Sequence, residues 1–435
     1  MFQLHDDGHN ALRISPMLIE VVKELDVLGL IELHLGFNDR RINGKGRLTR
    51  ICPTEKLISY FRKANFSIFE INTHSNKETI ILKDKEKDKD KDKKDPKYIE
   101  YKDTKETLRM RSFLKDYNQL LQDTHIDCCS LDRPYESRRD TKTKKIKKLV
   151  GVNQQNKFTE RSFARGSWSL GGRFYGGWWQ NISRELRQDI RINGERTIEI
   201  DYSGLHITLL YALKDISYFQ EVGSDPYDIV IPQINDADKR RWLVKNLLLM
   251  AINAKTEKKA FSALRNKTYE NNIKLSGVRL TNEFLGEVLQ KIKKKHIIIS
   301  DDLCSDAGVK LQFTDSKITE HILKYFMDMG IAVLSVHDSY IVPERLSDHL
   351  RDAMMDAWSE VLGIKPDESQ EYLESLLRMA TNVKQIGYVD ELLDIDPKGH
   401  EEIIQIKKKQ RESPRYLSSL KAFCEEKRDN NAKSP

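Results

Sequence analysis

The sequence has few cysteines and no long hydrophobic run. Its five cysteines include no pair at Cys-x-x-Cys spacing, and the one close pair, Cys128 and Cys129, is adjacent. This pattern excludes the common zinc sites and predicts free thiols in a reducing compartment. No window approaches 18 apolar residues, and the first residues lack the basic and apolar stretches of a secretory signal. We therefore expect an unexported, cytoplasmic protein with no membrane partner.

Charge of one sign is not in large excess either. Lys and Arg number 74 against 67 Asp and Glu, which gives a net charge of +7 and a pI near 8.8. Such a balance alone does not identify a polyanionic partner, because much of the lysine lies in one mixed-charge run. The length of 435 residues suits two or three domains.

Composition and hydrophobic pattern divide the chain into five parts. Residues 83–97 are almost pure Lys and Asp and cannot form a core, so we expect a disordered linker there. Residues 1–82 form a small module before it, and residues 98–165 form a helical connector or thumb-like region after it. Residues 166–397 hold the main domain. The charged tail, residues 398–435, is expected to be disordered.

The N-terminal module has the pattern helix, strand, basic glycine hairpin, strand and helix over residues 16–61. This order resembles a winged helix, in which the hairpin is the wing. The expected wing has four cations that would contact phosphates: Arg40, Arg41, Lys45 and Arg47. A generic α+β module with a solvated hairpin is the alternative, and both interpretations stay open. The basic stretch at residues 141–148 is likewise either a solvated loop or a phosphate contact.

Two acids at the ends of expected strands stand out. Asp201 follows an alternating apolar run, and Asp338 ends a second strand that starts near Ile331. Carboxylates delivered by neighbouring strands suit a two-metal phosphoryl-transfer site, where the ions lie roughly 3.5–4 Å apart. Helix or strand capping is the alternative role for these acids.

A strong helix by length and composition in the main domain carries a row of residues spaced four apart. Arg241, Lys245, Leu249 and Asn253 share one face of the helix expected over residues 239–254. Two cations followed by an apolar residue and an amide could bind a triphosphate and cover a base. An ordinary amphipathic helix explains the same spacing.

These residues resemble the motifs of the family A DNA polymerases. Asp201-Tyr202-Ser203 resembles motif A, Arg241-x3-Lys245 resembles motif B, and Val336-His337-Asp338 resembles motif C. Shorter matches occur in the same order at Gly172-Arg173, Gln180-Asn181-Ile182 and Gly223-Ser224-Asp225. The resemblance implies an α+β fold with a right-hand palm and fingers core, and a nucleotidyltransferase that copies primer–template DNA from nucleoside triphosphates.

The resemblance also implies a role for each matching residue. Asp201, Asp338 and the backbone carbonyl of Tyr202 would hold two Mg²⁺ ions, or Mn²⁺ in their place. Arg241 and Lys245 would contact the triphosphate, and the rest of the nucleotide site would come from Tyr202, His206, Leu249 and Asn253. The primer–template would contact Arg173, Gln180, Asn181, Gln312 and His337. The sequence shows no second acid cluster of the kind that a proofreading exonuclease needs.

Four positions depart from the family pattern. Ser339 replaces the usual second acid, as in the single-subunit RNA polymerases, and His206 stands where the family has a glutamate that excludes ribose. Leu249 replaces an aromatic ring, and Asn253 begins an Asn-Ala pair in place of Tyr-Gly. Two alternatives therefore stay open: a DNA-binding replication initiator or regulator with a degenerate polymerase core, and a single-subunit RNA polymerase or primase.

Overall fold

The computed structural model describes residues 11–15, 17–36, 49–64, 77–84, 97–139, 146–202, 204–223, 225–271, 273, 275, 277–363 and 412–433. These residues form helices and mostly antiparallel strands, a mixed composition compatible with the expected α+β class. Within these ranges, no helix has both the length and the hydropathy needed to cross a membrane.

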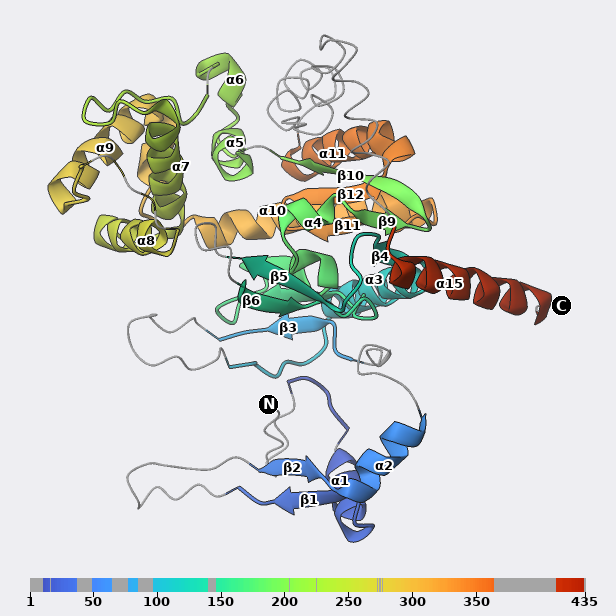
Figure 1. Ribbon diagram of the computed structural model, residues 1–435. Helices are drawn as coiled ribbons and strands as arrows, with labels where there is room; N and C mark the ends of the chain where they lie inside the picture. Colours follow the sequence, from blue (N-terminus) through green and yellow to red (C-terminus); the bar gives the residue numbers. More distant parts are fainter. Residues whose placement is uncertain are drawn as a thin grey trace.

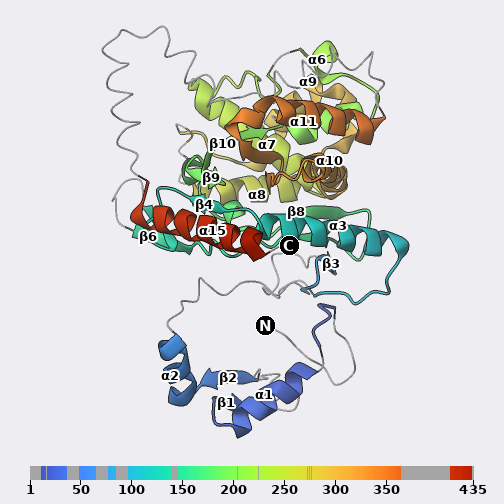
Figure 2. The same ribbon diagram turned by 90° about the vertical axis from the view of Figure 1, so that its right-hand side faces the viewer.

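The first elements follow the order expected from the sequence: α1 (Met17–Val27), β1 (Ile31–His34), β2 (Arg50–Pro53) and α2 (Glu55–Ala64). β1 and β2 pair antiparallel. Figures 1 and 2 show these four elements apart from the other labelled helices and strands. The four cations of the expected wing, Arg40, Arg41, Lys45 and Arg47, lie outside the described residues.

The expected domain boundary at residue 82 is wrong. β3 (Ile80–Leu82) pairs parallel with β7 (Glu160–Phe163), which pairs antiparallel with β8 (Gly171–Tyr175). Lys83 then forms a bridge with Tyr98, and the amide of Asp84 donates to the carbonyl of Lys97 at 2.8 Å. Because both ends of the Lys/Asp run meet in the main body, the run is an insertion and not a linker between domains. Its residues 85–96 lie outside the described part.

A five-stranded antiparallel sheet forms the centre, in the order β11 (Leu334–Val336), β12 (Ser339–Pro343), β10 (Glu195–Asp201), β9 (Ile190–Ile192) and β4 (Ile126–Cys128). Around it pack α3 (Lys105–Gln122), α10 (Gly308–Asp328) and α11 (Ser347–Leu362). Ile198 and Ile200 of β10 are buried, whereas Asp201 is only partly buried. The alternation of strand side chains thus places the acid on the face opposite the isoleucines.

A helical group follows β10, and Figure 1 shows α7, α8 and α9 beside the sheet. Its members are α5 (Leu205–Ala212), α6 (Tyr218–Glu221), α7 (Ala237–Asn253), α8 (Glu257–Glu270) and α9 (Asn282–Lys295). α7 begins where Asp236 accepts a hydrogen bond from the Lys239 amide at 3.1 Å, a typical N-cap. Between α3 and β8, β5 (Tyr135–Arg139) and β6 (Ile146–Gly151) form a separate hairpin, and α4 (Arg184–Arg187) precedes β9.

The expectation of a disordered tail is wrong for residues 412–433. Pro414–Lys433 form helix α15, which Figures 1 and 2 show beside α3 and β4. Arg415 donates to both carboxylate oxygens of Asp127 at 2.9 and 2.8 Å, and Tyr416 is fully buried. A buried carboxylate needs a partner, so this pair fixes the helix to β4.

Candidate active site

The structure brings Asp201 and Asp338 together at one end of the central sheet. Asp201 is the last residue of β10 and pairs in register with Ser339, while Asp338 lies in the tight turn between β11 and β12. The amide of Tyr202 donates to the carbonyl of Asp338 at 3.1 Å. His337 enters this turn with a φ of 60°, in the left-handed region. The antiparallel pairing therefore makes the two acids neighbours although they are far apart in sequence.

The pKa of the Asp201 carboxyl reflects the charge of Asp338 beside it. Burial raises the pKa of the Asp201 carboxyl, Arg184 opposes that rise, and the charges of Asp338 and Glu199 add to it. Like charges held this close favour a cation between them. Among the described residues, no three His, Cys, Asp or Glu side chains form a ready-made metal cluster. Two carboxylates nevertheless suit Mg²⁺, which keeps waters and substrate phosphates as its remaining ligands.

Arg173 on β8 lies in a chain of polar contacts next to the acids. Its Nε donates to Asp315 Oδ2 at 2.6 Å, and its Nη2 lies 3.2 Å from His206 Nε2. Because a guanidinium only donates, Nε2 must accept and the neutral ring carries its proton on Nδ1. Burial, with a further contribution from Arg173, lowers the pKa of His206 to about 4, so the ring is neutral at neutral pH.

Asp315 on α10 was not predicted as a site residue. It is fully buried, and burial raises the pKa of its carboxyl to about 7 despite the opposing charge of Arg173. Its Oδ1 has no hydrogen-bond partner among the described residues. The only signal in the sequence is an acid on the apolar side of an expected helix, between Leu311 and Ile318. Asp315 fixes Arg173, which in turn contacts His206.

A second ion pair involves Glu199, two residues before Asp201 on β10. Arg187 donates to both oxygens of Glu199 at 2.9 Å, and Ser339 Oγ donates to Glu199 Oε1 at 2.7 Å. The hydroxyl of Ser339 is therefore tied to a carboxylate of the neighbouring strand β10. The ring of His337 packs against Tyr175 with 6.1 Å between centroids. Burial lowers the pKa of His337, which keeps it neutral at neutral pH.

The predicted row on α7 faces outward. Arg241, Lys245 and Asn253 are exposed and Leu249 is half-buried, whereas the opposite face packs into the core through Leu243, Val244, Leu247 and Leu248. The Arg241 guanidinium lies 5.0 Å and the Lys245 ammonium 5.6 Å from the centre of the Tyr227 ring. Burial and Arg241 lower the pKa of Lys245, while Asp201 and Asp338 oppose this effect. Lys245 thus lies within electrostatic range of both acids.

Asp225, in the loop before α7, forms an ion pair with Arg241. The Arg241 Nε donates to Asp225 Oδ2 at 2.6 Å. Lys295 anchors the same loop by donating to the carbonyls of Asp225 and Asp228 at 2.8 and 2.9 Å. An anion that binds Arg241 would therefore share the guanidinium with Asp225 or displace that carboxylate. The sequence match at Gly223-Ser224-Asp225 identified the loop but not this ion pair.

Several predicted residues have other roles in this structure. The Tyr202 ring is buried and its hydroxyl donates to the Met354 carbonyl, so its side chain supports α11 and is not available to a nucleotide. Asn253 donates to the Leu249 carbonyl at 2.7 Å and packs against Gly308, where a Cβ would collide with Asn253 Oδ1. Gln312 is half-buried on α10.

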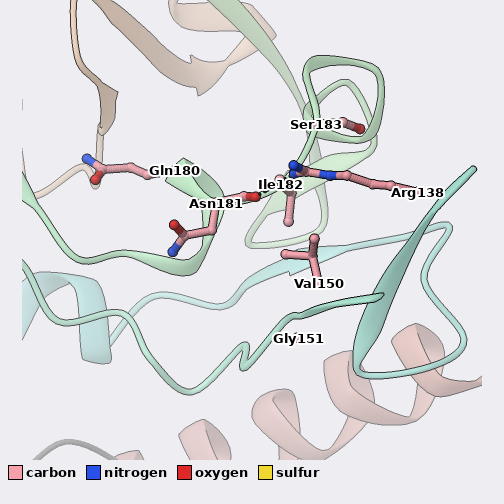
Figure 3. Close-up of a pocket in the computed structure, with 7 residues that line it drawn as sticks. All are labelled: Arg138, Val150, Gly151, Gln180, Asn181, Ile182 and Ser183. Atoms are coloured by element: carbon pink, nitrogen blue, oxygen red, sulfur yellow. Dashed lines mark hydrogen bonds between the residues drawn. The ribbon is translucent and has the colours of Figure 1, made fainter. Parts of the chain in front are cut away.

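Gln180, the last residue of a short 3-10 helix (Trp178–Gln180), and Asn181 border a pocket. Gln180 donates to the carbonyl of Ser335 in β11 at 2.9 Å, so it ties this segment to the strand that leads to Asp338. The pocket has a volume of about 720 Å³ and is lined by residues 180–183 and, from the β5–β6 hairpin, Arg138, Val150 and Gly151. Figure 3 shows the Arg138 side chain reaching from the hairpin toward this segment.

The amino-acid sequence matches no protein-family model, and a comparison with curated proteins finds no similar sequence. The function must therefore be argued from the site itself.

Proposed function

We propose that the protein is a template-dependent nucleic-acid polymerase that uses two-metal nucleotidyl transfer, with DNA as its first candidate product. The observation that carries the proposal is that Asp201, the last residue of β10, lies beside Asp338 in the turn between β11 and β12, and that the charges of both acids act on Lys245. In this proposal the five-stranded sheet is the palm, α7 to α9 are the fingers, and the N-terminal elements are a winged helix.

Each side chain near the acids has a role in the proposed reaction. Asp201 and Asp338, with the Tyr202 carbonyl, would hold two Mg²⁺ ions, which when bound stabilise the attacking and the leaving oxygen. Arg241 and Lys245 would bind the triphosphate, because phosphoryl transfer depends mainly on positioning and charge neutralisation. Arg173 and His337 would orient the primer terminus. The hydroxyl of that terminus would attack the α-phosphate of the triphosphate, and pyrophosphate would leave.

A ribonucleotide product is the second candidate, favoured by two observations at the same site. Ser339 bonds to Glu199 in place of a second metal-binding acid, and His206 is a neutral ring held by Arg173. A regulator with an inactive core is the third candidate, favoured by the engagement of Asn253 within its own helix and against α10. It would bind DNA through the N-terminal elements without incorporating nucleotides.

Primer extension tests the proposal directly. The purified chain should extend a labelled primer with Mg²⁺ and triphosphates, and Asp338→Ala should abolish extension. Asp348→Ala is the matched control, because Asp348 is an exposed acid on α11. Parallel reactions with ribonucleotides and deoxyribonucleotides, with and without primer, separate polymerase, RNA polymerase and primase. No incorporation on any DNA or RNA template would rule out the first two candidates.

A further inference from the structure

Arg161 on β7 is a buried arginine to which the proposed reaction gives no role. Its side chain is only 3% exposed and lies between two aromatic rings. The guanidinium carbon is 5.2 Å from the centre of the Phe163 ring and 5.1 Å from that of the Phe174 ring. A planar, weakly hydrated guanidinium suits such a position, but its buried donors need acceptors. The positions of those acceptors show what Arg161 holds in place.

The three nitrogens of the Arg161 guanidinium reach three different acceptors. Nε donates to the carbonyl of Gly172 at 2.8 Å, and Nη2 donates to Ser316 Oγ at 3.1 Å. Nη1 donates to Glu320 Oε2, and the other oxygen of Glu320 accepts from Arg109 on α3. Gly172 belongs to β8, whereas Ser316 and Glu320 lie one turn apart on α10. One guanidinium therefore joins β7, β8 and α10.

Two of these acceptors adjoin the ion pair between Arg173 and Asp315. Gly172 precedes Arg173 in β8, and Ser316 follows Asp315 in α10. Arg173 Nε donates to Asp315 Oδ2 at 2.6 Å. Each of these two hydrogen bonds from Arg161 thus fixes the residue next to one partner of the ion pair. Arg161 therefore constrains both sides of the pair from behind.

The close approach of β8 to α10 requires a glycine at position 172. Gly172 has a φ of +79°, in the left-handed region. A Cβ there would lie 2.9 Å from the Phe163 ring and 3.0 Å from Ser316 Oγ. β8 thus lies directly against the hydroxyl that Arg161 binds. A shift of either element would move the backbone that precedes Arg173.

We propose that Arg161 is a positioning residue for Arg173 in the polymerase reaction. It holds β8 and α10 so that the Arg173 guanidinium keeps its contacts with Asp315 and His206. This inference rests on the proposed function, in which Arg173 orients the primer terminus. Arg161 acts through the Gly172 carbonyl and the Ser316 hydroxyl, not through a contact with substrate. A displacement of about 1 Å caused by a distant residue can cost on the order of a hundredfold in rate, so the support has a measurable effect.

Steady-state kinetics separates positioning from stability. Arg161→Gln should lower kcat for primer extension by at least about tenfold and change KM for the triphosphate less than about twofold. KM is spared because the proposed triphosphate ligands, Arg241 and Lys245, lie on α7. The matched control is Arg415→Gln, which removes an arginine from the buried Asp127 at the edge of the central sheet opposite β11. The control should lose stability in urea but keep kcat within about twofold of the wild type.

The His206 ring reports the position of Arg173 without an assay of activity. Arg173 Nη2 lies 3.2 Å from His206 Nε2, which places the ring proton on Nδ1. Long-range proton–nitrogen NMR spectra, with His206→Gln to assign the signal, should show this tautomer in the wild type and in Arg415→Gln. In Arg161→Gln the signal should shift toward the Nε2–H tautomer, because Arg173 moves away. An unchanged His206 signal in the folded variant, or a loss of kcat no greater than that of the control, would overturn the proposal.

Ser316→Ala is a milder change that tests the same link if Arg161→Gln does not fold. It removes one acceptor of Arg161 and keeps the ion pair with Glu320. We expect the same direction of shift in the His206 signal and a kcat about threefold lower. The matched control is Ser305→Ala, because both serine hydroxyls also donate to the carbonyl three residues earlier, and it should change neither quantity. A wild type that extends no primer would remove the polymerase proposal, and the His206 signal would still decide whether Arg161 positions Arg173.

Discussion

The amide nitrogen of Tyr202 lies 3.1 Å from the carbonyl oxygen of Asp338. This hydrogen bond extends the pairing of β10 and β12 by one step, to the turn where the second acid lies. The backbone therefore holds the two residues that carry the carboxylates next to each other. A site fixed in this way pays its electrostatic cost on folding, before any substrate binds.

Neutralising one acid should make the protein more stable and less active. Burial and the charge of Asp338 both raise the pKa of Asp201, so the charged form is disfavoured in the folded state. We expect Asp201→Asn to raise Tm by about 2 °C at neutral pH without divalent ions, and primer extension to fall by at least about a hundredfold. Differential scanning calorimetry and an extension assay measure the two effects. A lower Tm with unchanged extension would contradict both expectations.

Divalent ions should make the wild type more stable than the Asp201→Asn variant. Mg²⁺ binds the folded state if the carboxylates are its ligands, so saturating Mg²⁺ should raise the Tm of the wild type. The variant with Asp201→Asn and Asp338→Asn should show no such rise. A variant with Asp348→Asn and Glu195→Gln loses the same two charges outside the site and should respond like the wild type. An equal response in all three proteins would exclude these acids as ligands.

Acid should destabilise the protein partly through His206. Its pKa is about 4 in the folded protein against an ordinary value of 6.5, so the unfolded chain binds more protons within this interval. Stability from this residue is therefore complete above about pH 6.5 and is lost as the pH falls toward 4. His206→Gln keeps an acceptor for Arg173 without a titrating ring. Its unfolding free energy should fall less between these pH values than that of the wild type, as urea titrations would show.

Lys245 should contribute to triphosphate binding. Its ammonium lies 5.6 Å from the centre of the Tyr227 ring, and the charges of both acids act on it. Lys245→Ala should raise the Kd for a nucleoside triphosphate by about tenfold, because a charge-assisted hydrogen bond contributes roughly 1.5–3 kcal/mol. Lys239→Ala removes a cation one turn and a half earlier on the same helix and should leave the Kd unchanged. An equal loss of triphosphate affinity in both variants would indicate that Lys245 acts only through the general positive charge of the helix.

The Arg415–Asp127 pair should stabilise the C-terminal helix strongly. Asp127 is only 1% exposed, so Arg415→Ala would leave a buried charge without its main partner. We expect a loss of about 3 kcal/mol in unfolding free energy. Lys421→Ala, at an exposed position of the same helix, should stay within about 0.5 kcal/mol of the wild type. Urea denaturation compares the two, and a loss below about 1 kcal/mol for Arg415→Ala would contradict the expectation.

Local patterns in the sequence predicted much of the fold. A helical region was predicted after residue 98, and α3 lies there, with an N-terminus capped by the Thr104 side chain, which accepts from the Thr107 amide. The strand that ends at Asp201 was predicted from its alternating apolar residues. The second predicted strand, from Ile331 to Asp338, is shorter in the structure, because β11 ends at Val336 and Asp338 lies in the turn that follows. Alternation could not show that β10 pairs with β12, the strand that follows Asp338, because register depends on contacts between distant residues.

The residues missed in the candidate site share a different cause. Asp315, Glu199 and Asp225 each pair with an arginine from another element, and nothing in a single sequence identifies such a pair. The position of α15 was missed for the same reason, because its partner Asp127 lies far away in the sequence. Conversely, Tyr202 matched a motif by type although its ring is buried in the core.

The bridge between Lys83 and Tyr98 has a consequence for how this chain can change in length. The two ends of the Lys/Asp run are held together by main-chain hydrogen bonds, including one of 2.8 Å between Asp84 and Lys97. Doubling such a loop costs only about 0.6 kcal/mol in closure entropy. Related chains with a longer or shorter acidic–basic repeat at this point should therefore keep the same β3 pairing, and a reporter peptide inserted there should leave the candidate site undisturbed.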